Sequence, residues 1–142
     1  MRTSPLALLA ALGAGAASAQ PDTWALLGQI EIDEVITDSS YSVTKRYPAA
    51  LGEDPQVVTI TGYAAPALPG DMVRELMLVA DMGSCPFCGS PDHGAALMVT
   101  LAEPVAFTDE TRRLTLRGTL KRVEDPETWQ AVVLEDAAIL PE

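Results

Sequence analysis

The chain has 142 residues, with 20 Asp and Glu against 9 Lys and Arg, so its formal net charge at pH 7 is −11. An acidic surface of this kind repels nucleic acid and anionic lipid, which argues against both as partners. With one histidine, the chain cannot form the histidine-based triad of a zinc hydrolase.

The first 19 residues have the composition of a secretory signal peptide. Arg2 supplies a short positive region, residues 6–16 form an apolar region, and residues 17–19 form a small-residue cleavage site. The apolar run is shorter than the roughly 20 residues of a membrane span. A buried N-terminal helix is the alternative, but no polar face interrupts the run. We therefore predict export, most simply to a bacterial periplasm, and no membrane insertion after cleavage.

Residues 20–55 are expected to form an N-terminal arm and loop. Asp22 or Thr23 can cap a short helical turn that carries Trp24 and Leu27 on one face. Near-alternating apolar residues at 30, 32 and 35 indicate a short strand. The segment 37–55 is polar and contains two prolines and a glycine, so a loop is expected there.

The barrel-forming part of the sequence is expected at 56–142, where alternation of apolar and polar residues predicts five strands. Alternation places Ile60 and Gly62 on one face of one strand, and Leu116 and Gly118 on the inward face of another. The run at 73–82 would also accept a helix. The expected strands are 57–63, 73–82, 95–104, 112–123 and 128–140.

Five short strands with short connections predict an all-β fold with a minor helical part, namely a small Greek-key barrel. Glycines in mid-strand, at 62 and 118, suit the bends and close approaches of such barrels. The pattern resembles the oligonucleotide/oligosaccharide-binding (OB) barrel. The resemblance concerns the fold alone, because the charge and the few aromatics of this chain are unsuited to nucleic acid.

Both cysteines and the only histidine fall in the stretch 84–94, "SCPFCGSPDHG". Cys85 and Cys88, with Pro86 between them and Gly89 after them, have the form of a zinc knuckle. His93 follows closely enough to be a third ligand. These three residues predict an open metal site for zinc or, as the alternative, copper.

The fourth ligand of this site is left open between Asp81, Asp92, water and a partner. Met98 falls on the fourth position of a retroviral-type knuckle, where a thioether would favour copper(I). A strand residue facing the core is the simpler interpretation of Met98. The methionines Met72, Met77 and Met82 are likewise interpreted as core packing.

Two other hypotheses for the cysteine pair remain. An oxidising compartment would allow a Cys85–Cys88 disulfide in a structural or interaction module. Cys-Pro-Phe-Cys also resembles the active site of glutaredoxin-like thiol-disulfide oxidoreductases. That activity is disfavoured because glycines and prolines follow Cys88 where a helix would be needed, and no βαβ pattern surrounds the motif.

The order of features resembles a widespread family of small exported bacterial proteins known only as a domain of unknown function. The resemblance rests on a Trp-x-x-Leu start, a Gly-Tyr-x-x-Pro strand end and a cysteine-centred segment. In this chain these are Trp24 with Leu27, then Gly62, Tyr63 and Pro66, then Cys85 and Cys88. Many members have Cys-x-His followed by prolines, whereas here the histidine comes later, at 93.

The resemblance implies an exported accessory protein, sometimes linked with metal handling or transport machinery, and no established catalytic activity. We therefore expect a non-enzymatic protein whose partners are a metal ion and a membrane transporter or another exported protein.

Overall fold

The computed structural model describes residues 22–81, 96–106 and 113–141. This part of the chain contains one helix and seven strands. They are α1 (Thr23–Leu27), β1 (Glu31–Ile36), β2 (Tyr41–Arg46), β3 (Gln56–Pro66), β4 (Val73–Val79), β5 (Ala96–Val105), β6 (Arg113–Arg122) and β7 (Val132–Ile139). No helix in the described ranges has the length and apolar character needed to cross a membrane.

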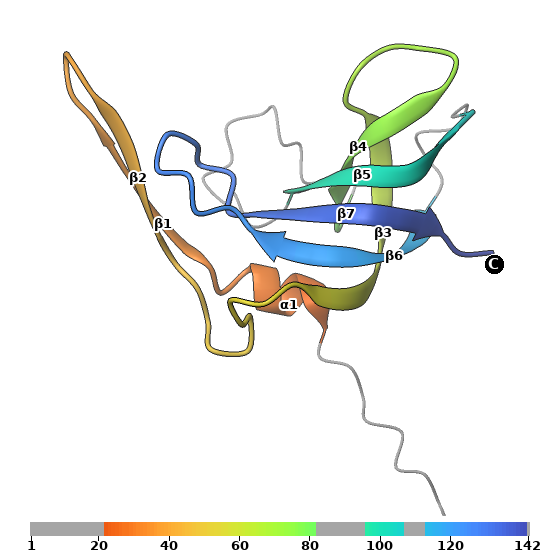
Figure 1. Cartoon of the computed structure of the whole chain (residues 1–142), viewed down its shortest axis with the longest axis horizontal. Helices are drawn as coiled ribbons and strands as arrows, with labels where there is room; N and C mark the ends of the chain where they lie inside the picture. The colour runs from red at the N-terminus through yellow and green to blue at the C-terminus, as the bar shows by residue number, and fades with distance from the viewer. Residues whose placement is uncertain (1–21, 82–95, 107–112, 142) are drawn as a thin grey trace, which may run out of the picture.

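Strands β3 to β7 form a closed barrel in the order β3-β4-β5-β7-β6 (Figure 1). All neighbours are antiparallel except β5 and β7, which run parallel. Because β7 is inserted between β5 and β6, the order is that of a Greek key. The all-β, five-stranded barrel predicted from the sequence is confirmed, and the ambiguous run at 73–82 contains strand β4.

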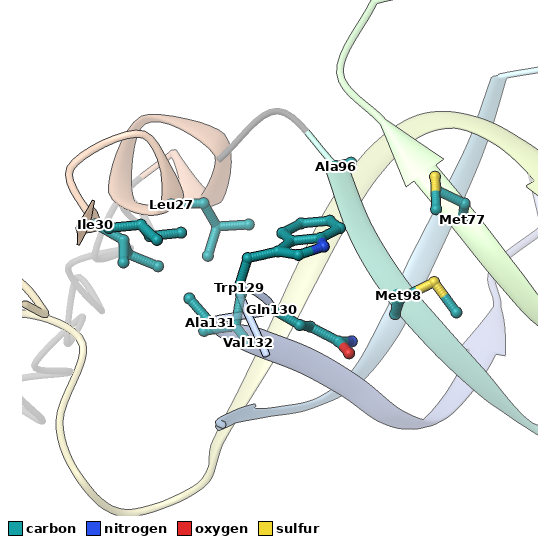
Figure 2. A pocket seen from close by; sticks show the side chains of 10 residues that line it. Leu27, Ile30, Met77, Ala96, Met98, Trp129, Gln130, Ala131 and Val132 are labelled. Carbon is teal, nitrogen blue, oxygen red and sulfur yellow. The ribbon is translucent and has the colours of Figure 1, made fainter. Parts of the chain in front are cut away.

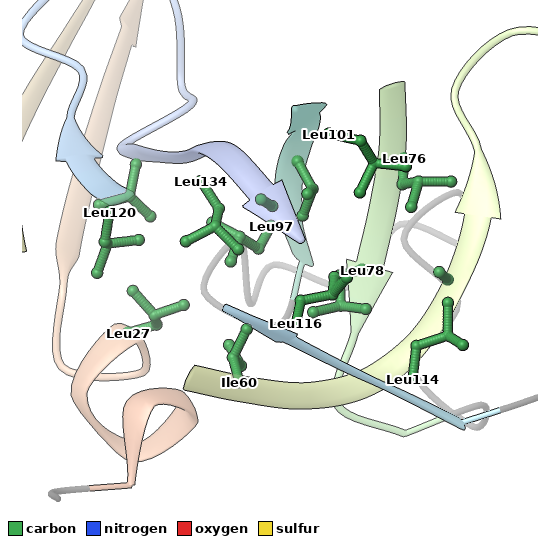
Figure 3. Packing of buried hydrophobic residues seen from close by; sticks show 14 of the residues in the cluster. Leu27, Ile60, Leu76, Leu78, Leu97, Leu101, Leu114, Leu116, Leu120 and Leu134 are labelled. Atoms are coloured by element: carbon green, nitrogen blue, oxygen red, sulfur yellow. The ribbon is translucent and has the colours of Figure 1, made fainter. Parts of the chain in front are cut away.

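The barrel interior is filled mainly by leucines that alternate with outward residues along each strand (Figure 3). Leu116 in β6 is fully buried, as the alternation predicted, and Ile60 in β3 is 3% exposed. Leu76, Leu78, Leu97 and Leu134 likewise have 0% exposure.

Two mid-strand glycines allow strands to approach more closely than any side chain would permit. A Cβ on Gly62 would lie 2.5 Å from the carbonyl oxygen of Val79, and a Cβ on Gly118 would lie 2.9 Å from that of Glu135. The close approaches expected from the sequence are therefore present at both positions.

Helix α1 attaches the N-terminal residues to the barrel. Asp22 is the N-cap, and its carboxylate accepts a hydrogen bond from the Trp24 backbone N–H at 3.1 Å. Leu26 and Leu27 belong to the barrel core, and the indole N–H of Trp24 donates to the carbonyl oxygen of Thr61 at 2.8 Å. The predicted cap and the predicted apolar face of this turn are confirmed.

Strands β1 and β2 form a hairpin that projects from the barrel (Figure 1). The expectation of a loop throughout 37–55 was wrong, because residues 41–46 are a strand. Val43 is the only buried residue of β2, so the strand lacks the apolar alternation by which strands are recognised.

The base of this hairpin is fixed to the segment between β6 and β7. The ammonium group of Lys45 donates to the carbonyl oxygens of Val123 at 2.8 Å and of Asp125 at 2.7 Å. The Val43 backbone N–H donates to the carbonyl oxygen of Pro126 at 2.8 Å. Burial lowers the pKa of Lys45, and the charges of Asp125 and Glu124 partly oppose this shift.

Candidate functional site

The three predicted metal ligands, Cys85, Cys88 and His93, lie outside the described residues. They belong to the sequence that joins β4 to β5, and the ends of these two strands are described. Val79, the last residue of β4, is the ladder partner of Ala96, the first residue of β5. The two ends of the connection therefore start from adjacent positions on one wall of the barrel.

Among residues 22–81, 96–106 and 113–141, no three His, Cys, Asp or Glu side chains are grouped so that they could hold a metal ion. Asp81, one of the predicted fourth ligands, is exposed two residues after the end of β4. Asp92, the other carboxylate considered, and Met82 lie outside the described residues.

A small apolar pocket lies beside this wall, on the outside of the barrel (Figure 2). It encloses a cavity of about 20 Å³, room for roughly one water-sized species. Its lining comes from α1, β1, β4, β5, β7 and the segment that precedes β7. The lining residues are Leu27, Ile30, Ile32, Met77, Ala96, Met98, Trp129, Gln130, Ala131 and Val132.

Met77 and Met98 form the sheet side of this pocket. They are direct partners in the antiparallel pairing of β4 and β5, and both are half-buried. The neighbours of Met77 in the chain, Leu76 and Leu78, are fully buried in the barrel, so alternation places Met77 on the outer face.

The expectation that these methionines pack in the core was wrong. In β5 the inward positions belong to Leu97 and Val99, which leaves Met98 on the outer face. Met72 precedes β4 and is 60% exposed. Short apolar runs gave no alternation from which the face of each methionine could be predicted.

Trp129 forms the opposite side of the pocket. Figure 2 shows its indole between Leu27 and Ile30 on one side and the methionines on the other. The indole is partly open to solvent, since Trp129 is 37% exposed. No sequence signal joined Trp129 to the methionines, because the three residues come from segments far apart in the chain.

The pocket lies near the ends of β4 and β5, between which the predicted ligands fall in the sequence. Side chains two residues apart on a strand share a face, so Met77 shares the outer face with Val79, and Met98 shares it with Ala96. Met77 and Met98 are thus each two residues along a strand, about 7 Å, from Val79 and Ala96, where β4 ends and β5 begins. Ala96 itself lines the pocket.

The donor atoms that the lining side chains offer are unusual for a pocket of this size. Among the described residues, no charged side chain lines it. Its heteroatoms are the thioether sulfurs of Met77 and Met98, the amide of Gln130 and the indole nitrogen of Trp129. Such a set cannot perform proton transfer or nucleophilic attack, but it can contact an apolar group or a soft cation.

Comparison with known proteins gives a fold relative and no functional one. No protein-family model matches the chain, and no curated protein matches it. The chain is similar to the crystal structure of a DUF3299 family protein from Pseudomonas aeruginosa PAO1, with a TM-score of 0.51 and 18% sequence identity. The similarity covers 69% of this chain and 68% of the other.

A likeness at 18% identity shows a shared fold and carries no activity from one chain to the other. The fold relative belongs to a bacterial family whose name denotes a domain of unknown function. The predicted resemblance to such a family is supported at this level. The short motifs around Trp24, Gly62 and Cys85 remain predictions.

Proposed function

We propose that this protein is an exported, non-enzymatic accessory protein that binds a zinc-like ion through Cys85, Cys88 and His93. Copper is the alternative ion. The role would be to carry or sense the ion, or to support a membrane transporter or another exported protein.

One observation carries this proposal: the connection with both cysteines and the only histidine starts and ends at paired positions. Val79 and Ala96 are partners on two strands of a closed barrel, so the two ends are held side by side. Binding residues are often carried by segments that join the strands of a rigid scaffold, and the position of Cys85, Cys88 and His93 between β4 and β5 in the sequence supports the proposal.

The chemistry of the ligand set favours transfer of the ion over permanent structural binding. Two thiolates and one imidazole suit zinc, but structural zinc sites have four protein ligands and three leave a position open. The formal charge of −11 raises the local concentration of cations around the chain and accelerates their association.

Metal content and thiol state, measured together, test the proposal. The full chain is expressed with its leader, purified from the exported fraction and examined for bound metal and for alkylated mass. We expect about one zinc per chain, lost in Cys85→Ser and Cys88→Ser and bound more weakly in His93→Ala. Ser84→Ala, a change of a non-ligand in the same stretch, is the matched control and should keep its metal.

Other outcomes would replace the proposal. Protein without metal, whose cysteines resist alkylation until reduced, would indicate a disulfide-closed structural or interaction module. If that disulfide were also reduced and reoxidised in turnover with a dithiol substrate, the protein would be a thiol-disulfide oxidoreductase.

Export is tested by the N-terminal sequence of the purified chain. We expect the mature protein to begin at Gln20, after the small-residue stretch 17–19. A chain that keeps residues 1–19 and remains in the cytoplasm would contradict this part of the proposal.

A further inference from the structure

We propose that Met77 and Met98 form a separate binding site for copper(I), in which the ion lies between their sulfur atoms and beside the indole of Trp129. This site consists of described residues alone and does not depend on Cys85, Cys88 or His93. It would be an ion-binding position on the outer face of the barrel.

The strand register brings the two thioethers to one place. Met77 and Met98 are direct partners across β4 and β5 and lie on the same outer face. Residues opposite one another in an antiparallel pair have Cβ atoms about 4.5–5.5 Å apart. Methionine side chains are long and unbranched, so two sulfurs at this spacing can reach a single ion between them.

The size of the pocket fits an ion and excludes most organic ligands. The cavity of about 20 Å³ holds roughly one water-sized species, whereas small-molecule sites usually measure about 300–1,000 Å³. A water molecule or a monatomic ion is therefore the size of species that this pocket can enclose.

The donor atoms of the pocket determine which ion it would bind. Thioether sulfur prefers soft copper(I), while magnesium and calcium require several oxygen ligands. None of the described residues that line the pocket has a carboxylate to compensate a divalent charge, and a charge in apolar surroundings is costly unless it is paired. A soft monovalent cation meets both conditions best.

The indole ring of Trp129 supplies a further attraction for a cation. The face of an indole attracts a cation more strongly than that of any other aromatic side chain. Figure 2 shows the Trp129 ring across the pocket from the methionines, and the 37% exposure of Trp129 leaves a path from solvent. Methionines that served only as core packing would be expected inside the barrel, where leucines already fill the space.

The test uses a variant without the other proposed ligands, Cys85→Ser/Cys88→Ser/His93→Ala. Copper(I) is titrated into it without oxygen, against a chromophoric copper(I) chelator. We expect one copper(I) per chain, and a loss of affinity of roughly tenfold or more when Met77→Leu and Met98→Leu are added. Met72→Leu is the matched control, because Met72 is exposed outside the pocket, and it should leave the affinity unchanged.

Two further measurements guard against misfolding and indirect effects. Circular dichroism must show that the leucine variants keep the β spectrum of the parent. X-ray absorption of copper(I) on the selenomethionine-labelled, cysteine-free chain should show copper–selenium scattering that survives Met72→Leu. Trp129→Phe should weaken the copper-dependent change in tryptophan fluorescence.

The inference is overturned if the cysteine-free variant binds no copper(I). It is also overturned if the paired leucine variant binds copper(I) as tightly as its parent, or if no copper–selenium scattering appears. Each result is independent of zinc binding by the intact chain, so failure of this site and failure of the cysteine–histidine site can be distinguished.

Discussion

Gly62 lies where β3 passes between β4 and helix α1, with no room for a side chain. A Cβ there would meet the Val79 carbonyl oxygen at 2.5 Å, and a carbon of the Trp24 ring at 3.1 Å. The backbone oxygen cannot move without disturbing the β3–β4 pairing, and Trp24 is held by its hydrogen bond to Thr61. The glycine is therefore required by packing.

We predict that Gly62→Ala lowers the free energy of unfolding by about 1–3 kcal/mol, the usual cost of overpacking. Urea denaturation monitored by circular dichroism measures the change. Gly70→Ala is the matched control, because a Cβ there would lie 3.5 Å from the Met72 carbonyl oxygen, an ordinary contact distance. Equal stability of the two variants would contradict the prediction.

Tyr47 places a titratable hydroxyl at the base of the projecting hairpin. This hydroxyl lies 3.0 Å from the carbonyl oxygens of both Val123 and Ala131 and can donate to either. Burial raises the pKa of Tyr47, and Glu124 adds to the shift, while the Arg122 guanidinium, 4.4 Å from the ring centre, opposes it. The folded state therefore favours the protonated phenol.

A raised pKa fixes the sign of the pH dependence. The stabilisation is complete below the unfolded pKa of about 10 and is lost as the pH rises through the higher folded value. Between about pH 9 and pH 11, stability should thus fall more steeply in the native protein than in Tyr47→Phe. Lys45, whose pKa is lowered, contributes the opposite slope to both proteins, so it cancels in the comparison. Parallel curves from urea denaturation would show that Tyr47 does not carry this effect.

At the scale of elements, the β1–β2 hairpin depends on a few contacts with the segment between β6 and β7. The Lys45 ammonium bridges two backbone carbonyl oxygens there, those of Val123 and Asp125. Arg46, on the other face of β2, instead pairs with Glu31 and Asp33, and all three side chains are more than half exposed. Exposed ion pairs contribute little, about 0–1 kcal/mol.

We predict that Lys45→Met accelerates amide hydrogen exchange along β1 and β2 and leaves exchange in β5 unchanged. The substitution removes the ammonium group that donates the two hydrogen bonds, so the hairpin opens locally while the barrel stays folded. Arg46→Met is the control, and its effect on exchange should be much smaller. Unchanged exchange in the hairpin of the Lys45 variant would refute the role of this contact.

The elements also show which parts of the structure the sequence could predict. Strands β3 and β6 bury one face, so the alternation around Ile60 and Leu116 predicted both strands, and for β6 also the face that points inward. Strand β2 buries only Val43, so its sequence reads as a polar loop.

The two candidate ion sites also differ in how far the sequence could predict them. Cys85, Cys88 and His93 are close in sequence, and spacing alone suggested a metal ligand set. Met77 and Met98 are far apart in the chain and meet only through the register of β4 and β5. Trp129 joins them from a third segment, and no periodicity in the sequence specifies that contact.

At the scale of the whole molecule, the surplus of acidic residues is the dominant electrostatic feature. With 20 acidic and 9 basic residues, like charges are brought closer together by folding than they are in the unfolded chain. Salt screens this repulsion, because the Debye length falls from about 30 Å at 0.01 M to about 3 Å at 1 M.

We predict that Tm at pH 7 rises when NaCl is increased from about 0.01 M to about 0.5 M, because screening relieves the repulsion. Differential scanning calorimetry measures the change. Near the sequence pI of about 4.3 the same salt step should have far less effect, since the net charge is then close to zero. A Tm that is unchanged or lower in salt at pH 7 would contradict the prediction.

The position of β7 in the barrel also constrains the order in which the chain can fold. During synthesis β3, β4, β5 and β6 emerge before β7, yet β7 separates β5 from β6 and pairs with both. Until β7 has been synthesised, β5 and β6 each have one edge without a partner, and such edges are prone to pair with other chains. The barrel therefore cannot close one hairpin at a time. Its closure depends on a long-range contact made last, which slows folding and keeps the chain open until the final strand is available.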